Sequence, residues 1–258
     1  MKLRVAGVVA SSLFAMSACG GSSSGSSSMP PGASGMARVR FADGAPELET
    51  LIGGTPQTLC LGADAPCYLR VNGQTVSQLF YYGTMTSFLS VTAGALSLVA
   101  RDGAGYAVGP FKSPVLVAGK QYTLIVLGSY PKYSVLAFEE PPSSKGNAQL
   151  SLYEASPSVP SADFGSFRAS SHSGFKALGS AKFGNLVTVP LGASVSNFGG
   201  YTGKGSKPFT GGDLTLAGVN AFDKHNELPF HTASRFSLFL FDTKSGSTSG
   251  PVFGSLDR

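Results

Sequence analysis

Residues 37–48 read ARVRFADGAPEL, and residues 148–159 read AQLSLYEASPSV. Both segments place small, apolar, acidic and proline residues at the same positions in the same order. Alternation between apolar and other side chains is typical of a β-strand, whose successive side chains point to opposite faces. Val39 and Phe41 are expected to face a core. Arg40 is expected on the opposite, half-exposed face of the sheet.

Two further matches, the first of them in two parts, repeat in the same order along the chain. They match residues 82–83 to 183–184, residues 91–94 to 189–192 with Val91 aligned to Val189, and residues 121–127 to 235–241. Motifs that recur in one order indicate duplicated structural units. Pro141 and Pro142 separate the copies, because proline cannot donate a backbone hydrogen bond to a sheet. We therefore expect two domains, at residues 37–142 and 147–258.

The composition and the spacing of turn residues indicate an all-β protein. The 258 residues include 34 Gly and 16 Pro, and short β-branched and aromatic runs recur between turn-forming clusters. Asn72-Gly73 between two such runs is a strong hairpin signal. Residues 122–127 and 236–241 are apolar on both faces, which predicts central strands covered on both sides. The expected fold is two tandem immunoglobulin-like or transthyretin-like β-sandwich domains.

A family resemblance rests on five segments of the chain. ARVRFADGAP, YLRVNG, FYYGTMTSFLSVTAG, GKQYTLIVLG and the repeated AQLSLYEASPSVP resemble the bacterial domain-of-unknown-function family 4397. The resemblance covers most of residues 37–141 and, more weakly, 148–245. It implies secreted or lipid-anchored, often tandem, β-sandwich-like modules, and it implies no activity. The first half departs from the family in carrying Asp43-Gly44 where a His is usual.

The N-terminus is expected to be a lipoprotein signal peptide, residues 1–18. Lys2 and Arg4 precede an apolar run over residues 5–16, which is too short to cross a bilayer. Met16-Ser17-Ala18-Cys19 resembles the bacterial lipobox, in which the cysteine thiol is lipidated and becomes the mature N-terminus. The alternative is an ordinary signal peptide followed by an unrelated cysteine.

A linker is expected between Cys19 and the first domain, over residues 19–36. Its Ser, Gly and Pro composition favours a disordered tether, about 20–25 Å long on average and at most about 55 Å when extended. Gly20 stands where an Asp would favour retention at the inner membrane. The expected location is therefore the cell envelope, anchored by lipid in the outer membrane of a Gram-negative bacterium.

The other two of the three cysteines, Cys60 and Cys67, lie close together in sequence. A short spacing with turn residues between them favours a disulfide in an oxidising envelope. The alternative is a metal or redox pair. The spacing is not C-x-x-C, and no histidine is nearby in sequence, so the disulfide is the preferred interpretation.

Catalytic motifs are scarce. Outside the Ser/Gly linker, where residues 21–25 read GSSSG, the sequence contains no G-x-S-x-G. It contains no H-E-x-x-H, and the glycine-rich residues 199–209 lack the spacing of a phosphate loop. Asp223, His225, Glu227 and His231 form the one candidate metal-binding group. Polar and proline residues around them favour a solvated loop instead. We expect no cofactor.

The charge and the aromatic content limit the classes of partner that we expect for this chain. Only 13% of residues are charged, the formal net charge is +5, and no run of Lys and Arg alternates with aromatics, so nucleic acid is not an expected partner. The first hypothesis is a non-catalytic binding or structural module that is held to the membrane by its lipid and contacts an envelope protein. The second is a glycan-binding adhesin or sensor that uses Tyr81, Tyr82, Tyr130 and Tyr133. The third is a metal-dependent hydrolase.

Overall fold

The computed structural model describes residues 35–61, 64–142, 149–168, 173–190, 198–201, 215–216, 219–220, 235–242 and 252–257. These residues form strands, turns and connections, and none of them lies in a helix. Within these ranges there is accordingly no helix of the length and apolar character that a membrane span requires. The expected all-β class is confirmed.

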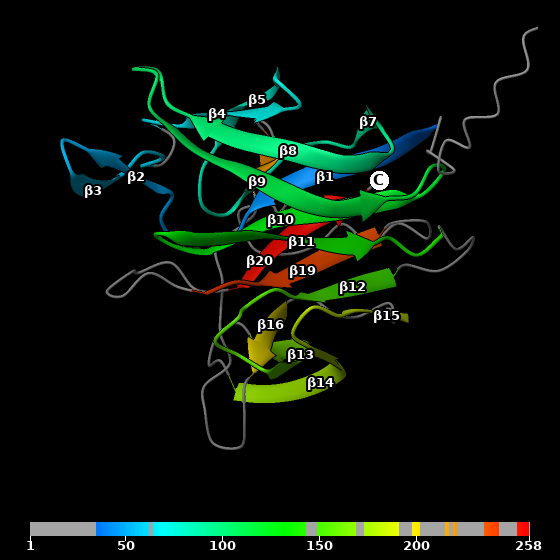
Figure 1. The fold of residues 1–258 in the computed structure, drawn as a ribbon. Helices are drawn as coiled ribbons and strands as arrows, with labels where there is room; N and C mark the ends of the chain where they lie inside the picture. The colour runs from blue at the N-terminus through cyan, green and yellow to red at the C-terminus, as the bar shows by residue number, and fades with distance from the viewer. Residues whose placement is uncertain are drawn as a thin grey trace, which may run out of the picture. The chain divides into compact units, whose positions relative to one another are not determined.

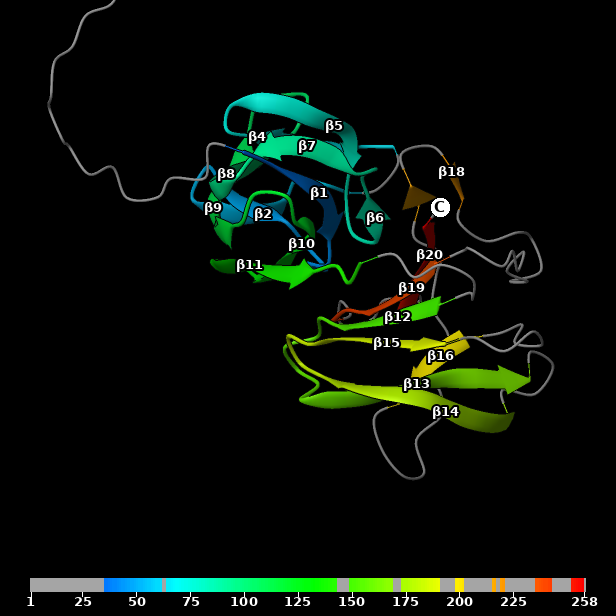
Figure 2. The same cartoon turned by 90° about the vertical axis from the view of Figure 1, so that its right-hand side faces the viewer.

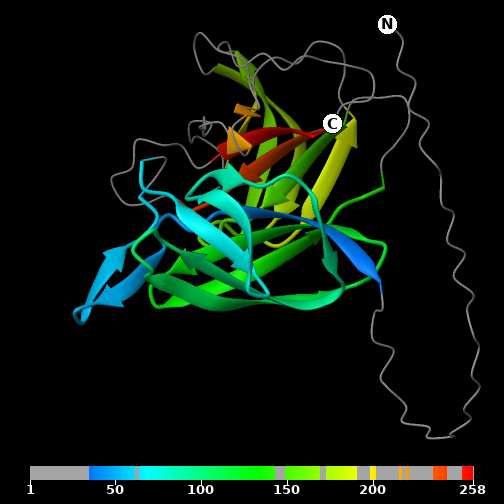
Figure 3. The ribbon, with the colours of Figure 1, turned by 90° about the horizontal axis from the view of Figure 1, so that it is seen from above.

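The first half of the described chain, residues 35–142, contains eleven strands. They are β1 (Met36–Asp43), β2 (Glu49–Ile52), β3 (Thr55–Thr58), β4 (Cys67–Val71), β5 (Gln74–Phe80), β6 (Thr84–Met85), β7 (Leu89–Thr92), β8 (Gly94–Arg101), β9 (Ala107–Leu116), β10 (Gln121–Ser129) and β11 (Lys132–Glu139). Asn72 and Gly73 both have positive φ and connect β4 to β5, which confirms the hairpin. The β2–β3 hairpin stands away from the other strands (Figure 3).

The second half, residues 149–257, supplies the remaining described strands. They are β12 (Gln149–Glu154), β13 (Ser161–Arg168), β14 (Ser173–Lys182), β15 (Leu186–Pro190), β16 (Phe198–Tyr201), β17 (Thr215–Leu216), β18 (Val219–Asn220), β19 (Arg235–Leu240) and β20 (Val252–Asp257). Strand β17 pairs with β6 of the first half, so the hydrogen bonding is not confined to each half.

The sheets lie in four layers (Figures 1 and 2). The order is β5-β4-β8-β9 in the first layer, β11-β10-β1-β6 with β7 beside β1 in the second, β15-β12-β19-β20 in the third and β14-β13-β16 in the fourth. Each half thus pairs a sheet that contains a parallel strand pair with a sheet of antiparallel strands.

Three apolar cores fill the spaces between the layers. The first core joins the first and second layers through side chains such as Phe41, Leu98 and Leu124. The second half has its own core between the third and fourth layers, with Leu152 and Phe164. Between the second and third layers lies an interlayer core, made of Ala42, Met85, Ile125, Leu127, Phe138, Tyr153, Ala155, Phe239 and Phe241. The two halves are therefore packed together through apolar side chains that are buried away from water.

The internal repeat is reproduced strand for strand. Strand β1 runs parallel to β10 with Arg38 opposite Gln121, and β12 runs parallel to β19 with Gln149 opposite Arg235. The sequence alignment makes these two pairs equivalent, so both halves use the same register. The amide of Gly83 donates to the Asp43 carbonyl at 2.8 Å, and the amide of Gly184 donates to the Glu154 carbonyl at 2.9 Å.

One alignment within the repeat was wrong by two residues. Val189 pairs with Leu150, whose counterpart in the first half is Val39. Val39 pairs with Leu89, whereas Val91 pairs with Ala37. The equivalent of Val189 is therefore Leu89, and the connections that lead from Gly83 and Gly184 to these residues differ in length by one residue.

The face of β1 that carries Arg40 is exposed at Arg38, as expected, but it is buried from Arg40 onward. Arg40 is 2% exposed, and Ala42 on the same face packs in the interlayer core. The cause is the third layer, which covers this face of the sheet. The third layer likewise covers the outer face of β10, and the second and fourth layers cover the two faces of β19, so both strands are buried on both sides, as their sequences predicted.

Candidate functional site

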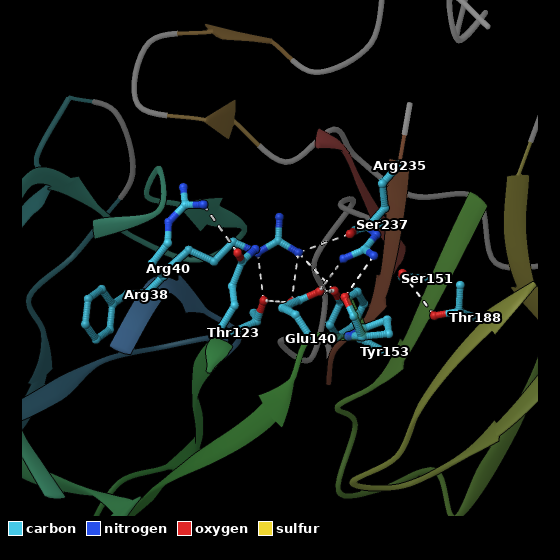
Figure 4. Close-up of polar contacts among 12 residues, drawn as sticks. Arg38, Arg40, Thr123, Glu140, Ser151, Tyr153, Thr188, Arg235 and Ser237 are labelled. Atoms are coloured by element: carbon cyan, nitrogen blue, oxygen red, sulfur yellow. Dashed lines mark hydrogen bonds and ion pairs between the residues drawn. The ribbon is translucent and has the colours of Figure 1, made fainter. Parts of the chain in front are cut away.

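A cluster of polar side chains lies between the second and third layers (Figure 4). We call it the interlayer cluster, and its members are Arg40, Thr123, Glu140, Tyr153, Arg235 and Ser237. The strands β1, β10, β12 and β19 supply all of them except Glu140, which follows β11 directly. The cluster therefore draws on both halves of the repeat.

Arg40 is the centre of the interlayer cluster. Its Nε donates to Thr123 Oγ1 at 2.7 Å, and its terminal nitrogen Nη2 donates to Tyr153 Oη at 3.0 Å and to Ser237 Oγ at 3.1 Å. The same nitrogen forms an ion pair with Glu140 at 3.3 Å. One guanidinium thus bonds to β10, to the end of β11, to β12 and to β19.

Glu140 is held from both halves. Tyr153 Oη lies 2.7 Å from each of its carboxylate oxygens, and Thr123 Oγ1 donates to Oε1. Arg235 approaches Oε2 at 3.5 Å and also donates to the carbonyl of Pro141 at 2.9 Å. Glu140 is therefore bonded by side chains of both halves.

Aromatic rings enclose the cluster. The Arg40 guanidinium carbon lies 4.7 Å from the centre of the Phe88 ring, and the Tyr153 ring stacks on Phe239 with 4.2 Å between centres. The side chains of Arg40 and Glu140 are each 2% exposed. A ligand from solution cannot reach these groups, so the interlayer cluster holds layers together and is not a binding site.

Two buried carboxyls occupy equivalent places in the repeat. Asp43 Oδ1 accepts from the amide of Ala45 at 3.0 Å, and Glu154 Oε1 accepts from the amide of Ser156 at 2.9 Å. Asp43 Oδ2 and Glu154 Oε2 have no hydrogen-bond partner among the described residues. Both residues are fully buried.

The environment of these carboxyls favours their neutral forms. Burial raises the pKa of Asp43 to about 8, against the lowering effect of the Ala45 amide. Burial likewise raises the pKa of Glu154 to about 8, the Ser156 amide opposes this, and the negative charge of Asp242 adds to it. Burial, Asp43 and Asp242 also raise the pKa of Tyr82, whose hydroxyl donates to the Asp242 carbonyl at 2.8 Å.

An accessible cleft lies at the end of the first half where β10 turns into β11. Its volume is about 360 Å³, and Glu49, Leu51, Pro110, Tyr130 and Tyr133 are among its lining residues. The Tyr133 hydroxyl donates to the Glu47 carbonyl at 2.9 Å and accepts from the Glu49 amide at 2.8 Å. Tyr133 therefore fixes the start of β2 against the cleft, while the half-buried Tyr130 ring lines it. We call this the tyrosine cleft.

The structure separates the four tyrosines of the glycan hypothesis. Tyr130 and Tyr133 line the tyrosine cleft. Tyr81 packs against the first core, and Tyr82 packs against the interlayer core, where its ring lies 6.2 Å from that of Phe241. Only one pair of the four is therefore placed to stack on a shared ligand.

The cysteine prediction is confirmed for one pair. Cys60 and Cys67 form a disulfide with their Cα atoms 5.1 Å apart, and both are buried in the first core. A link across so short a loop stabilises by about 2–3 kcal/mol in the chain-entropy model. Cys19 lies outside the described residues, as do Asp223, His225, Glu227 and His231. Among the residues that the structure does describe, no group of three or more His, Cys, Asp or Glu could hold a metal ion.

Sequence reasoning missed the interlayer cluster. Arg40 was expected on an open face, and Glu140 and Arg235 were assigned no role. One signal was available, because Arg40 and Ser237 are polar positions on strands whose neighbouring positions are apolar. Polar residues in such strands are expected to find partners when the strands are buried.

The comparisons with known proteins bear on the family resemblance alone. A family model described as a domain of unknown function (DUF4397) matches residues 63–165. The matched range runs from the disulfide loop through β12 and into β13, so it crosses from the first half into the second. No curated protein matches the chain. The resemblance of this chain to the domain-of-unknown-function family 4397 is therefore shown, over residues 63–165.

Proposed function

We propose that this chain is a lipid-anchored protein of the bacterial cell envelope, and that its body is a non-catalytic binding or structural module. In this proposal the body consists of two immunoglobulin-like or transthyretin-like β-sandwich domains, residues 37–142 and 147–258, which act as one unit. The lipid is attached at Cys19, and Gly20 favours the outer membrane.

One observation carries the non-catalytic part of the proposal. The largest group of interacting charged and hydroxyl side chains among the described residues is sealed between two sheets, with Arg40 and Glu140 each 2% exposed. These groups join the two halves and cannot meet a substrate. An accessible cleft with aromatic walls lies elsewhere, at Tyr130 and Tyr133, and such a cleft suits binding.

Lipidation is tested by the fate of Cys19. We expect the mature N-terminal peptide to begin at Cys19 and to carry the mass of a diacylglyceryl group, and the protein to sediment with outer-membrane vesicles. Cys19→Ala should release the protein from that fraction, because the two or more acyl chains of a lipoprotein make anchoring stable. Cys60→Ala is the matched control and should remain in the membrane fraction. An unmodified N-terminal peptide would refute the proposal.

The tyrosine cleft favours a second candidate, a glycan-binding adhesin or sensor. Tyr130 and Tyr133 line one cleft together with the Glu49 carboxylate and the Thr50 hydroxyl. An aromatic ring can pack against the apolar face of a sugar while carboxylate and hydroxyl groups bond to its hydroxyls. This candidate is compatible with lipid anchoring, and in it the ligand of the module is a glycan.

A glycan array of the whole protein tests this second candidate. We expect Tyr130→Ala to weaken a bound glycan about tenfold, equivalent to about 1.4 kcal/mol, because it removes the packing surface of the ring. Tyr68→Ala is the control, since Tyr68 is a 40% exposed tyrosine on β4 that does not line the cleft. No glycan above background, or equal weakening by both variants, would exclude the tyrosine cleft as a glycan site.

A further inference from the structure

Three aliphatic side chains are exposed where the described chain enters the body. Met36 is 52% exposed, Val115 is 74% exposed and Val117 is 54% exposed. We call these residues the entry patch. Met36 is the first residue of β1, while Val115 and Val117 lie at the end of β9 and just after it. Exposed aliphatic residues gathered in one place indicate an interaction surface.

Backbone contacts hold the parts of the entry patch together. The amide of Gly119 donates to the Met36 carbonyl at 2.9 Å, and the amide of Ala93 donates to the Gly35 carbonyl at 2.9 Å. A Cβ atom on Gly35 would lie only 2.6 Å from that of Ala118, so the chain passes tightly against the turn between β9 and β10. The patch is therefore fixed to the point where the chain enters.

Exposed charge beside the patch is mainly positive. Arg38 on β1, Lys112 on β9 and Lys120 before β10 are all exposed. Lys120 forms an ion pair with Glu139 at 2.7 Å, with both side chains about half exposed. Aliphatic side chains bordered by lysine and arginine are the composition of surfaces that rest on anionic lipid.

Because the linker keeps the body near the membrane, a surface that binds lipid weakly is sufficient to orient it. Only residues 20–34 separate Cys19 from Gly35, a distance of at most about 55 Å when extended. A second contact made by a tethered body is intramolecular, with an effective concentration on the order of millimolar. Three aliphatic side chains would bind a membrane poorly alone, but they need only orient a body that the lipid already holds nearby.

We propose that the entry patch rests on the membrane that holds the Cys19 lipid. This inference depends on the proposed lipid anchor and adds an orientation to it. The patch lies before the start of β10, and the tyrosine cleft lies beyond its end, in the turn at Tyr130. In Figure 1 the start of β1 and the β2–β3 hairpin are at opposite ends of the first half. With the patch on the membrane, the tyrosine cleft faces away from it.

A tryptophan reporter tests this orientation, because the chain contains no tryptophan of its own. Val117→Trp places the reporter in the patch, and Leu51→Trp is the matched control at the hairpin, since Val117 is 54% exposed and Leu51 is 53% exposed. The lipidated protein is reconstituted into vesicles of phosphatidylethanolamine and phosphatidylglycerol that carry lipids brominated near the headgroup. Tryptophan prefers the membrane interface wherever it is placed, so the control carries the same bias.

We expect the Val117→Trp emission to shift to the blue and to lose most of its intensity to bromine, while the Leu51→Trp emission stays at longer wavelength and is not quenched. Adding Val115→Asp to the Val117→Trp variant should abolish the quenching. Equal quenching of both reporters, or greater quenching at residue 51, overturns the orientation while the lipid mass on Cys19 upholds the anchor. If no lipid is attached to Cys19, the anchor itself fails, and the orientation fails with it.

Discussion

Glu140→Ala is expected to destabilise the protein by about 3–5 kcal/mol, the largest loss of any single substitution proposed for this chain. It leaves the Arg40 guanidinium buried without the carboxylate that it faces at 3.3 Å. The Tyr153 hydroxyl loses its acceptor as well. Burying an uncompensated charge is far more costly than losing a contact in water. The free energy of unfolding in urea measures the loss.

Glu139 offers a control one residue away. It also forms an ion pair, with Lys120 at 2.7 Å, but both side chains are about half exposed. Glu139→Ala is expected to cost about 1 kcal/mol or less, because water screens an exposed pair. Equal effects of the two substitutions would show that the interlayer cluster does not carry the stability assigned to it.

A double replacement separates stability from charge. Arg40→Met combined with Glu140→Leu removes both charges and leaves apolar side chains in the same layer. Apolar replacements of a buried ion pair are often as stable as the pair or more stable. We therefore expect the double variant to recover most of what Glu140→Ala loses.

The second large effect is a dependence of stability on pH. Asp43 and Glu154 each have a pKa near 8 in the folded protein, because both are buried, and a pKa near about 4 in the unfolded chain. Between these values the folded state holds more protons than the unfolded state. Stability is therefore full below about pH 4 and falls as the pH rises through 8, by about 1.4 kcal/mol per pH unit for each carboxyl.

Amide substitutions isolate this contribution. Asp43→Asn with Glu154→Gln keeps a carbonyl oxygen for the Ala45 and Ser156 amides and removes the ionisation. We expect the double variant to match the natural protein only below about pH 4 and to exceed its unfolding free energy by several kcal/mol at pH 9. Glu139→Gln, at an exposed position, should leave the slope of the unfolding free energy against pH unchanged. If the unfolding free energies of the natural protein and the double variant changed with pH in the same way, the assignment of the pH dependence to Asp43 and Glu154 would be wrong.

The repeat and the apolar pattern made two central strands predictable from sequence. Residues 121–127 and 235–241 were expected to be central strands, and β10 and β19 have buried side chains on both faces. The hairpin at Asn72 and the disulfide were equally local, because each depends on residues close together in the chain. Local patterns of this kind are set by backbone geometry and turn chemistry.

The packing of one half on the other could not be predicted in the same way. Alternation along β1 shows that Arg40 lies opposite Phe41, but it does not show what covers Arg40. The covering layer comes from residues more than 100 positions later, and Glu140 lies directly before the two prolines that were expected to separate the domains. An arginine in an alternating strand is more often exposed, so the prediction followed the commoner case.

The tyrosine cleft shows the same limit. Tyr130 and Tyr133 were singled out as residues that stack on sugars if exposed. Their pairing with Glu49 and Leu51 depends on the fold, because these residues are some eighty positions apart in sequence. Tyr81 and Tyr82 had the same residue type and are half-buried as well, and only their position away from the tyrosine cleft distinguishes them.

Strand β1 has a mechanical consequence. It is hydrogen-bonded on one side to β10 over six residue pairs and on the other to β7 over four. The chain enters at its first residue, so tension applied at Gly35 against a load held at the tyrosine cleft acts along the strand. The bonds on both sides would then have to shear together instead of opening one at a time. Resistance to pulling is set by the rate of forced unfolding, and this geometry makes that rate low.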